Sequence, residues 1–585
     1  MKKSGLLLKL IGYLKKEKYR IGLITILLFV INGLSLLIPT LTGQIIDLID
    51  LHLSVGNTSA WRDIFKMSGS MLVIALGVWG LSAIQNILAI KVSQNTVLQL
   101  RHDTFKQLMH LPIRYFDKNT KGNIISIITT DINHMSESIS NDMTVLLNAV
   151  FTVVGALYFM VQISWKMSLV FVVTVPTMFL VSRIISKASR RLFRQKKQAY
   201  GGLVGYTEEM ITAQKTIKVY GIECYNEEQF IEKSRALCDI GQRAEYNSSL
   251  MMPSMNFIGH MNVILICAIG IYLVLEGGIS IGEISGFVLY SKRFSAPIVN
   301  MASLLNSIQI TMAACERVFG ILDYDKEKTE CIDAKSNKMN LKGEVTFEKV
   351  TFGYDEQKMI LKDINLEIKA GEKIAIVGET GSGKSTFINL LMRFYDVSSG
   401  QIKMDGRPIG DYPLEDLRAR IAMILQESWL FTGSVYDNIV YALPEEKRHL
   451  ESVQSLCKQI QVDDFIQSLP GGYHFILQGE SQALSTGQRQ LLSIIRTFLC
   501  QPDIFILDEA TSAIDPQMEQ EIKAVTDRVI EGKTSFIIAH RLSTIKDADR
   551  ILVMKNGSIV ESGQHEDLLA REGVYWEIYQ SQFAS

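Results

Sequence analysis

The sequence predicts an α-helical membrane domain of six transmembrane helices followed by an α/β domain of the P-loop NTPase type. Three observations predict this order. Residues 1–322 hold six predominantly apolar windows, and about 20 such residues can cross a bilayer as a helix. Residues 323–342 form a polar, charged linker. Residues 343–585 open with "EVTFEKVTF", which alternates like a strand, and continue as a water-soluble αβ domain.

The six expected spans cover about 21–46, 67–90, 143–163, 167–186, 256–275 and 283–312. Buried helices of a large soluble core are a poorer explanation, because stretches such as "IGLITILLFVINGLSLLI" lack a polar face. The last window is the most polar of the six and depends partly on its neighbours. We expect no Lys, Arg, Asp or Glu in the middle of any span, which gives no support to ion coupling.

Uncharged polar residues remain inside the spans. They either line a cavity for an amphiphilic solute or hydrogen-bond one helix to another, and we favour the second role. They are Asn32, Gln85, Asn86, Asn148, His260, Asn262, Asn306 and Gln309.

The distribution of Lys and Arg predicts the orientation. Basic residues crowd the N-terminus and the segment 183–243, whereas the other connections carry few. We therefore expect a multi-pass protein of a bacterial plasma membrane with both termini in the cytoplasm. Two long cytoplasmic hairpins would end in "RYFDKNTKGN" (114–123) and "AQKTIKVYGIE" (213–223), which either dock on the domain below, the role we favour, or are solvated tips.

Charge and cysteine content argue against two classes of site. The formal net charge is −1, which gives no reason to expect nucleic acid as a partner. The seven cysteines show no CxxC pair and no metal-ligand spacing, so reduced structural thiols are expected.

The stretch "KIAIVGETGSGKSTFINLL" predicts a phosphate-binding loop. A short apolar strand leads into G-x-x-x-x-G-K-S, from Gly378 through Gly383 to Lys384 and Ser385. The glycines let backbone N–H groups surround phosphates, Lys384 neutralises the β- and γ-phosphates, and Ser385 can bind Mg²⁺.

Polar residues at the ends of three further strands point to the chemistry around such a loop. "DIFILDEATSAID" ends a strand, expected beside the P-loop, in Asp508 and Glu509, which can orient Mg²⁺ and the attacking water, although two acids there can also cap a helix. Gln426 ends "IAMILQ" and His540 ends "SFIIAH". Tyr354 precedes the loop and either stacks on adenine or packs.

The stretch "ALSTGQRQLL" (483–492) predicts a second anion site. Ser485 has the position of a helix cap, and a helix start offers free backbone N–H groups to an anion. One chain would thus carry two such sites.

Together these motifs resemble a known family. The P-loop, Gln426, "LSTGQ", "ILDEATSAID" and "IIAHRLST" occur in the order found in the nucleotide-binding domain of ABC transporters. The six spans, "RYFD…G" and "ERVFGILD" resemble a half-transporter of the type IV ABC exporters, of the multidrug-exporter kind. The resemblance covers essentially the whole chain.

The resemblance implies a Mg²⁺-dependent ATPase coupled to transport, with these roles. Glu509 would be the catalytic base, with His540 at the γ-phosphate, Gln426 nearby and Asp515 against the opposite subunit. The ATP-binding residues would be Tyr354, Gly378, Glu379, Thr380, Gly381, Ser382, Gly383, Lys384, Ser385, Thr386, Ser485, Gly487 and Gln488. The Mg²⁺ ligands would be Ser385, Gln426 and Asp508.

It also implies why two anion sites occur. In this family the signature motif binds the γ-phosphate of ATP held by the P-loop of the other subunit, so two chains would enclose two ATP molecules. Closure would pull on the hairpins near Phe116 and Ile217 and switch the cavity by alternating access. The usual signature reads L-S-G-G-Q, and Thr486 replaces its first glycine. This departure favours a heterodimer with a second half-transporter over a homodimer.

The expected cargo is a hydrophobic or amphiphilic small molecule, exported in the multidrug manner. Lipid, peptide or metal-chelate transport by the same architecture is the alternative. A regulatory ATP-binding membrane subunit is a further one, although the intact Glu509 argues against it.

Overall fold

The computed structural model describes residues 3–55, 60–327, 342–355, 358–424, 429–478, 484–508, 516–538 and 545–583. The chain divides into two compact units. The helical unit comprises Met1–His110 and Thr120–Tyr324, and the αβ unit comprises Leu111–Asn119 and Asp325–Ser585. The nine residues 111–119 are therefore counted with the αβ unit, although they lie within the N-terminal part of the sequence.

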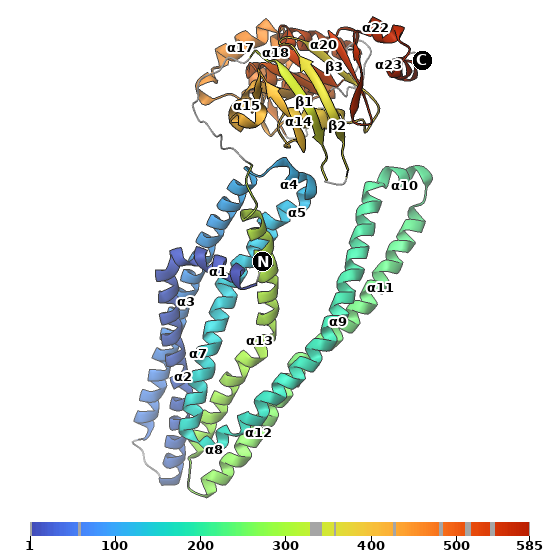
Figure 1. The fold of residues 1–585 in the computed structure, drawn as a ribbon. Coiled ribbons are helices and arrows are strands. Elements are labelled where there is room, and N and C mark those ends of the chain that lie inside the picture. The colour runs from blue at the N-terminus through green and yellow to red at the C-terminus, as the bar shows by residue number, and fades with distance from the viewer. Residues whose placement is uncertain are drawn as a thin grey trace. The chain divides into compact units, whose positions relative to one another are not determined.

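Long helices build the helical unit (Figure 1). In order they are α1 (Lys3–Leu14), η1 (Lys15–Glu17), α2 (Lys18–Val55), α3 (Ala60–Leu108), α5 (Lys121–Ser126), η2 (Ile127–Asp131), α6 (Ile132–Glu137), η3 (Ser138–Asp142), α7 (Met143–Ile163), α8 (Trp165–Ser168), α9 (Val170–Thr212), α10 (Gln214–Tyr220), α11 (Glu223–Ser249), α12 (Met251–Leu275) and α13 (Ile281–Leu322).

Five stretches of helix in the described residues are long and apolar enough to cross a membrane, and they contain the first five expected spans. They are Leu8–His52, Trp61–Leu108, Lys121–Ile163, Trp165–Thr212 and Glu223–Leu275. The sixth window lies within α13, which is one continuous helix but is not among the five. The sixth span therefore remains a prediction.

Helices α2 and α13 touch backbone to backbone near the start of α13. A Cβ built on Gly43 would lie 2.5 Å from the carbonyl oxygen of Gly282, so neither position has room for a side chain. Asp47 of α2 accepts hydrogen bonds from Ser280 Oγ and from the Gly282 N–H, both at 2.7 Å. The start of α13 is thus held both by its own capping box of Ser280 and Glu283 and by the Asp47 carboxylate of α2.

Two π-helical turns interrupt the run from α5 to α7, and each ends in an aspartate that reaches α13. Asp131, at the end of η2, accepts from Arg317 Nε at 2.6 Å and from its NH2 at 2.5 Å. Asp142, at the end of η3, accepts from Ser307 Oγ at 2.5 Å. A π turn rotates the following side chains, and here it turns both carboxylates toward the same helix.

Helices α9 and α11 run side by side to the short helix α10 (Figure 1). Val219 and Tyr220, at the end of α10, are exposed in this chain. The other tip contains α4 (Ile113–Lys118) and belongs to the αβ unit, where Arg114 donates to the Tyr354 carbonyl at 3.4 Å and Tyr395 OH donates to Asp117. Docking of the 213–223 tip stays a prediction.

Two main sheets form the αβ unit. The antiparallel sheet has the order β2-β1-β4-β5 and the larger one the order β12-β11-β3-β10-β9-β6, in which only the β11–β12 pair is antiparallel. Their strands are β1 (Val345–Phe352), β2 (Leu361–Ile368), β3 (Lys373–Val377), β4 (Ser399–Met404), β5 (Arg407–Pro408), β6 (Ile421–Ile424), β9 (Ile504–Asp508), β10 (Thr534–Ile538), β11 (Arg550–Lys555) and β12 (Ser558–Gly563). A short antiparallel pair joins β7 (Gly433–Ser434) and β8 (Ile476–Leu477).

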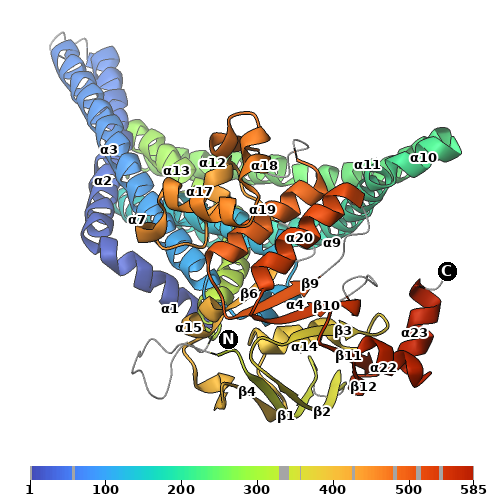
Figure 2. The same ribbon diagram turned by 90° about the horizontal axis from the view of Figure 1, so that it is seen from above.

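Helices cover the larger sheet on both faces, as apolar parallel strands require. Buried residues of α19 and α20 form one core with one face of the sheet, and those of α14 and the antiparallel sheet form another with the opposite face (Figure 2). The helices are α14 (Lys384–Leu391), η4 (Ile409–Asp411), α15 (Leu414–Arg420), α16 (Val435–Ile439), η5 (Glu445–Lys447), α17 (Leu450–Gln459), α18 (Asp463–Ser468), η6 (Gly472–His474), α19 (Thr486–Leu499), α20 (Pro516–Ile530), α22 (His565–Ala570) and α23 (Val574–Phe583).

The strand order separates β9 from β3. Strand β9, which ends in Asp508, is not paired with the P-loop strand β3, because β10 lies between them, although Asp508 still acts on Lys384 of the loop. Ile538 of β10 pairs with Ile376 on one side and with Asp508 on the other. Sequence order alone does not reveal this, since strands joined by crossover helices can be inserted between earlier ones.

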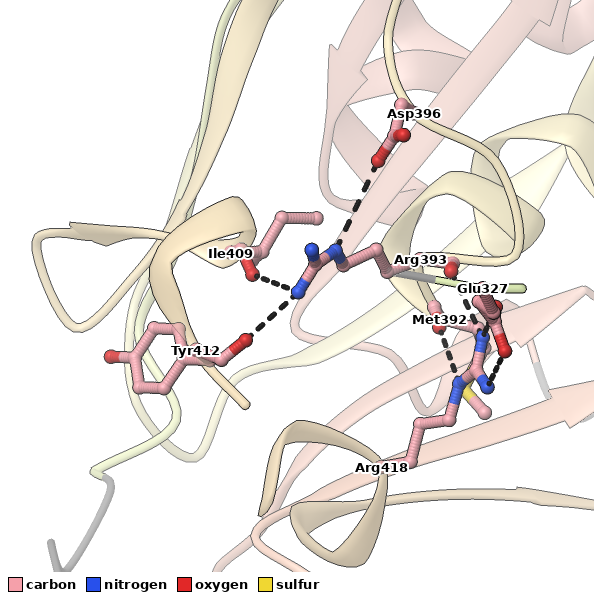
Figure 3. A network of polar contacts seen from close by, with 7 residues as sticks. All are labelled: Glu327, Met392, Arg393, Asp396, Ile409, Tyr412 and Arg418. Carbon is pink, nitrogen blue, oxygen red and sulfur yellow. Dashed lines mark hydrogen bonds and ion pairs between the residues drawn. The ribbon is translucent and has the colours of Figure 1, made fainter. Parts of the chain in front are cut away.

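Arg418 and Arg393 link Glu327 to the residues that follow α14 in the αβ unit (Figure 3). Arg418 donates to both carboxylate oxygens of Glu327, at 2.6 and 3.0 Å, and to the Arg393 carbonyl at 3.0 Å. Arg393 in turn donates to the carbonyls of Ile409 and Tyr412 at 3.2 and 2.9 Å. Residue 327, the last described before 342, is thus held on the αβ unit.

Candidate functional site

The loop from β3 to α14 has the geometry of an anion cradle. Gly381 and Gly383 have φ of +83° and +106°, which side chains with a Cβ rarely adopt. A Cβ on Gly378 would lie 2.3 Å from the Met554 carbonyl oxygen of β11. Glycine at these positions lets the loop turn tightly against the sheet, so that its backbone can approach a phosphate closely.

Lys384 places a cation inside this loop. Its side chain is only 8 % exposed, and its amine donates to the carbonyls of Gly378 at 2.6 Å and Glu379 at 2.9 Å. Burial lowers the pKa of Lys384, and the nearby Asp508 carboxylate opposes this shift. A buried amine bonded to neutral carbonyls is a strong attractor for phosphate.

The hydroxyl of Ser382 is a further group of the loop that could bind a phosphate. Its hydroxyl is buried and has no hydrogen-bond partner among the described residues. Buried hydroxyls are normally satisfied, so an unpaired one facing a cation-bearing loop is consistent with a missing polar ligand. Residues 378–386 form the loop and the start of α14, with Thr380 in the exposed part of the loop, and their contact with ATP stays a prediction.

Two of the three residues expected to bind Mg²⁺, Ser385 and Asp508, are described, and they lie at the same edge of the sheet. Ser385 is the second residue of α14, and Asp508 is the last residue of β9. Asp508 acts electrostatically on Lys384, which follows the loop, so the carboxylate lies close to the cradle. A hydroxyl and a carboxylate are the oxygen ligands that Mg²⁺ prefers, so the donor set fits the ion.

Tyr354 lies in an aromatic cluster next to α14. Its ring packs edge-on against Tyr395 and Phe352, with centroids 4.9 and 5.1 Å away. Its hydroxyl lies 3.3 Å from Thr386 Oγ1, and Asn389 Nδ2 donates to it at 3.3 Å. The ring is 36 % exposed, which leaves a face for a planar ligand.

The second helix start is a capping box. Gln488 N–H donates to Ser485 Oγ at 3.2 Å, and Ser485 N–H donates to Gln488 Oε1 at 2.9 Å. The predicted cap at Ser485 is therefore confirmed as a helix cap. Thr486 is the first helical residue, its hydroxyl accepts from Arg489 at 3.4 Å, and Gly487 follows it as a buried residue.

Four expected site residues lie outside the described residues: Gln426, Glu509, Asp515 and His540. The strands that precede three of them, β6, β9 and β10, run parallel to one another, and β10 runs parallel to β3. All these strands therefore end at the edge of the sheet where the P-loop begins. The roles of the four residues stay predictions.

A charged residue in the helical unit escaped the sequence analysis. The expected sixth span contains "SKRF" at 291–294, so the expectation that span middles lack ionisable residues is wrong there. Arg293 is half-buried and donates to Ser35 Oγ of α2. It borders a cavity of about 490 Å³ between α7 and α13. The sequence signal that could have revealed Arg293 was the basic pair at 292–293, which was obscured because the mean hydropathy of the span is dominated by its apolar residues.

Known families match both parts of the chain. A family described as "ABC transporter transmembrane region" matches residues 21–298, and one described as "ABC transporter" matches residues 361–512. A "Fatty acid ABC transporter ATP-binding/permease protein" of Mycobacterium tuberculosis is 37% identical over 507 residues, which are 87% of this chain and 79% of that protein.

Two further curated relatives cover nearly the whole chain. An uncharacterized ABC transporter ATP-binding protein of Bacillus subtilis, YfiC, is 35% identical over 99% of this chain and 94% of its own. An "ATP-dependent lipid A-core flippase" of Psychrobacter cryohalolentis is 33% identical over 99% of this chain and 95% of its own. Among solved structures, that of a bacterial Atm1-family ABC exporter with ATP bound matches with a TM-score of 0.79 and 25% identity, over 97% of this chain and 99% of that one.

Proposed function

Since the chain belongs to the ABC exporters, as a half-transporter with fused membrane and ATPase domains, we propose that its dimer exports a lipid-type amphiphile by alternating access. The chain is an integral multi-pass membrane protein and an ABC-type translocase driven by ATP. Half-transporters of this family function as dimers.

The choice of a lipid over a general small molecule comes from the relatives. One is named for fatty acids and another for the lipid A core. These names favour the alternative given above, lipid transport, over the multidrug reading. The exposed apolar side chains along the helical unit agree with a cargo that enters from a bilayer.

The buried amine of Lys384 is the observation that carries the ATPase function. It can neutralise phosphate charge without solvent screening, and the loop carbonyls hold it in place. Ser385, Asp508 and Gln426 are proposed to hold Mg²⁺, which would neutralise charge on the β- and γ-phosphates when bound.

The remaining roles follow the sequence motifs. We assign the catalytic base to Glu509, contact with the γ-phosphate to His540, and contact with adenine to Tyr354. The domain limits proposed are 1–322, a linker at 323–342, and 343–585. Both termini are proposed to lie in the cytoplasm.

The partner is proposed to present its own P-loop to the helix start at Ser485. This start offers N–H groups to an anion and has the Arg489 guanidinium beside it, but it lacks a glycine loop and a buried amine such as Lys384, so we infer that it binds an ATP held by another surface. Thr486 favours a different chain as partner over a second copy, because a β-branched residue restricts the backbone beside the phosphate.

The test uses the full chain in lipid nanodiscs. Glu509→Gln should nearly abolish Mg-ATPase activity while ATP stays bound in a closed dimer, because the nucleotide cradle is untouched. Glu521→Gln, a change of the same kind on an exposed face of α20, should leave the rate unchanged. In liposomes, only the chain with Glu509 should move a fluorescent fatty acid across the membrane. Normal hydrolysis by Glu509→Gln would contradict the assignment.

The oligomeric mass of the chain expressed alone separates the two partners. A stable dimer with Glu509-dependent hydrolysis would show a homodimer. A monomer, or a dimer without activity, would support the heterodimer.

A further inference from the structure

A cavity in the helical unit has an apolar wall and a single charged group. Its volume is about 490 Å³, within the range of about 300–1,000 Å³ that is usual for ligand pockets. Helix α7 contributes four valines to the wall, among them Val145, Val150 and Val154, and α13 contributes Ala296 and Leu304. Such a wall suits a hydrocarbon chain.

The polar residues gather at one part of the cavity. Asn148 and Thr152 of α7 line it, and both are bonded to Asn32 of α2: Asn32 Nδ2 donates to Asn148 Oδ1, and Thr152 Oγ1 donates to Asn32 Oδ1, each at 2.7 Å. The carbonyl oxygens of Asn32 and Asn148 and the hydroxyl of Thr152 are therefore hydrogen-bonded within the protein. Arg293 of α13 lines the same cavity and donates to Ser35 Oγ.

The charge of Arg293 is not balanced within the described part of the chain, where no carboxylate forms an ion pair with it. Arg317 on the same helix differs, because both oxygens of Asp131 bind its guanidinium. A cation in an expected span is costly unless it is paired or serves a ligand. The hydroxyl of Ser35 orients the guanidinium but leaves its charge uncompensated.

We propose that Arg293 is the counter-ion for the carboxylate head group of a single-chain amphiphile, whose hydrocarbon chain lies along the valines of α7. This rests on the proposed function and narrows its substrate class. A guanidinium presents parallel N–H groups that match a carboxylate, and the cavity has space for one chain beside it. Arg293 would thus determine specificity for charge, and the wall would determine the preference for chain length.

The experiment compares head groups on one chain length. The full-length dimer in nanodiscs is titrated with palmitate, hexadecanol and hexadecylamine, and the stimulation of Mg-ATPase is recorded. Binding of radiolabelled palmitate without nucleotide is measured in parallel. Palmitate should act at about tenfold lower concentration than hexadecanol, and hexadecylamine should be weakest, since one charge-assisted pair distinguishes them.

Arg293→Gln should remove the preference for palmitate over hexadecanol, and Arg293→Lys should restore part of it, because an ammonium keeps the charge but lacks the planar fork. Lys292→Gln removes the neighbouring, exposed cation and should change neither preference nor basal rate. Ser35→Ala removes the protein partner of Arg293 but keeps the cation, so the preference should survive.

Two results would overturn the proposal. One is an Arg293→Gln dimer that still prefers palmitate, and the other is a Ser35→Ala dimer that loses the preference as fully as Arg293→Gln, which would make the role of Arg293 structural. Failure of the proposed function gives a different pattern. In that case no amphiphile stimulates hydrolysis or crosses the membrane, while the palmitate binding measurement still decides whether Arg293 recognises the carboxylate.

Discussion

The starts of α14 and α19 in the αβ unit both have sequences typical of anion-binding sites, but their structures differ. The start of α14 follows three glycines and carries a buried amine that is bonded only to loop carbonyls of Gly378 and Glu379 in the described structure. The start of α19 is closed by the reciprocal bonds of Ser485 and Gln488, and Ser485 is exposed.

The difference shows which site is complete in one chain. The loop before α14 supplies a cation, an unpaired hydroxyl and a tight backbone turn, so it can bind phosphate alone. The start of α19 uses two of its donors on its own cap, and the N–H groups of Thr486 and Gly487 remain by helix geometry. A site of that kind contributes to binding only beside another surface.

The largest effect expected is that of Lys384→Ala. Removing the buried ammonium should cost ATP binding about 2–5 kcal/mol, because the phosphate charge is then left without its desolvated partner. Binding of a fluorescent ATP analogue measures this. Lys369→Ala, an exposed lysine of the same unit, should bind ATP normally. Equal affinity of Lys384→Ala and the unmodified chain would show that the loop does not hold the nucleotide.

Two alanine substitutions in the glycine loop separate crowding from backbone strain. Both glycines have a positive φ, +157° at Gly378 and +83° at Gly381, so alanine is strained at either position, and only Gly378→Ala also brings a methyl to 2.3 Å from the Met554 carbonyl oxygen. Gly378→Ala should therefore lower the free energy of unfolding by about 1–3 kcal/mol more than Gly381→Ala. Thermal unfolding with and without ATP measures both, and equal losses would contradict the close approach of the loop to β11.

Ser485→Ala sharpens the comparison with a matched control in the same unit. Ser434 caps α16 through a capping box with Asp437, in the same manner as Ser485 with Gln488. Each substitution should cost about 1 kcal/mol of stability. Only Ser485→Ala should also slow ATP hydrolysis by the dimer. If Ser434→Ala slowed hydrolysis equally, the loss would come from the helix cap and not from an anion site.

Thr486→Gly should have the smallest effect. It removes the Oγ1 acceptor of a 3.4 Å hydrogen bond from Arg489, and it restores the glycine that is usual in the family. In a homodimer the ATPase rate should be preserved or raised. A large loss of rate would show that the threonine has a function of its own, in agreement with a dedicated partner chain.

The sequence was most informative where the chemistry is local. The residues of the P-loop are consecutive, and the cap at Ser485 depends on the residue three positions later, so spacing alone identifies both. The insertion of β10 between β3 and β9 depends on crossovers of many residues, and no local pattern records it.

Other features that the sequence did not predict depend on pairs of residues that are distant along the chain. Nothing near Arg317 indicates Asp131 as its partner, because the pair joins two helices that are distant in sequence. Asn32, Asn148 and Asn262 were expected to hydrogen-bond between helices, and they do, although Asn148 also lines the cavity. Arg293 was overlooked since a hydropathy window averages two cations, Lys292 and Arg293, among many apolar neighbours.

The contact between Gly43 and Gly282 has a mechanical consequence. Because the backbones of α2 and α13 are in direct contact at these glycines and Asp47 forms hydrogen bonds with α13, the two helices are held together at this point. Ser35 and Arg293 lie farther along α2 and α13, so the contact between Gly43 and Gly282 also restricts how these two residues move relative to one another. Among the described residues, no glycine of α7 makes such a backbone contact with α13, so a displacement of α7 would change the size of the cavity while Ser35 keeps the guanidinium oriented.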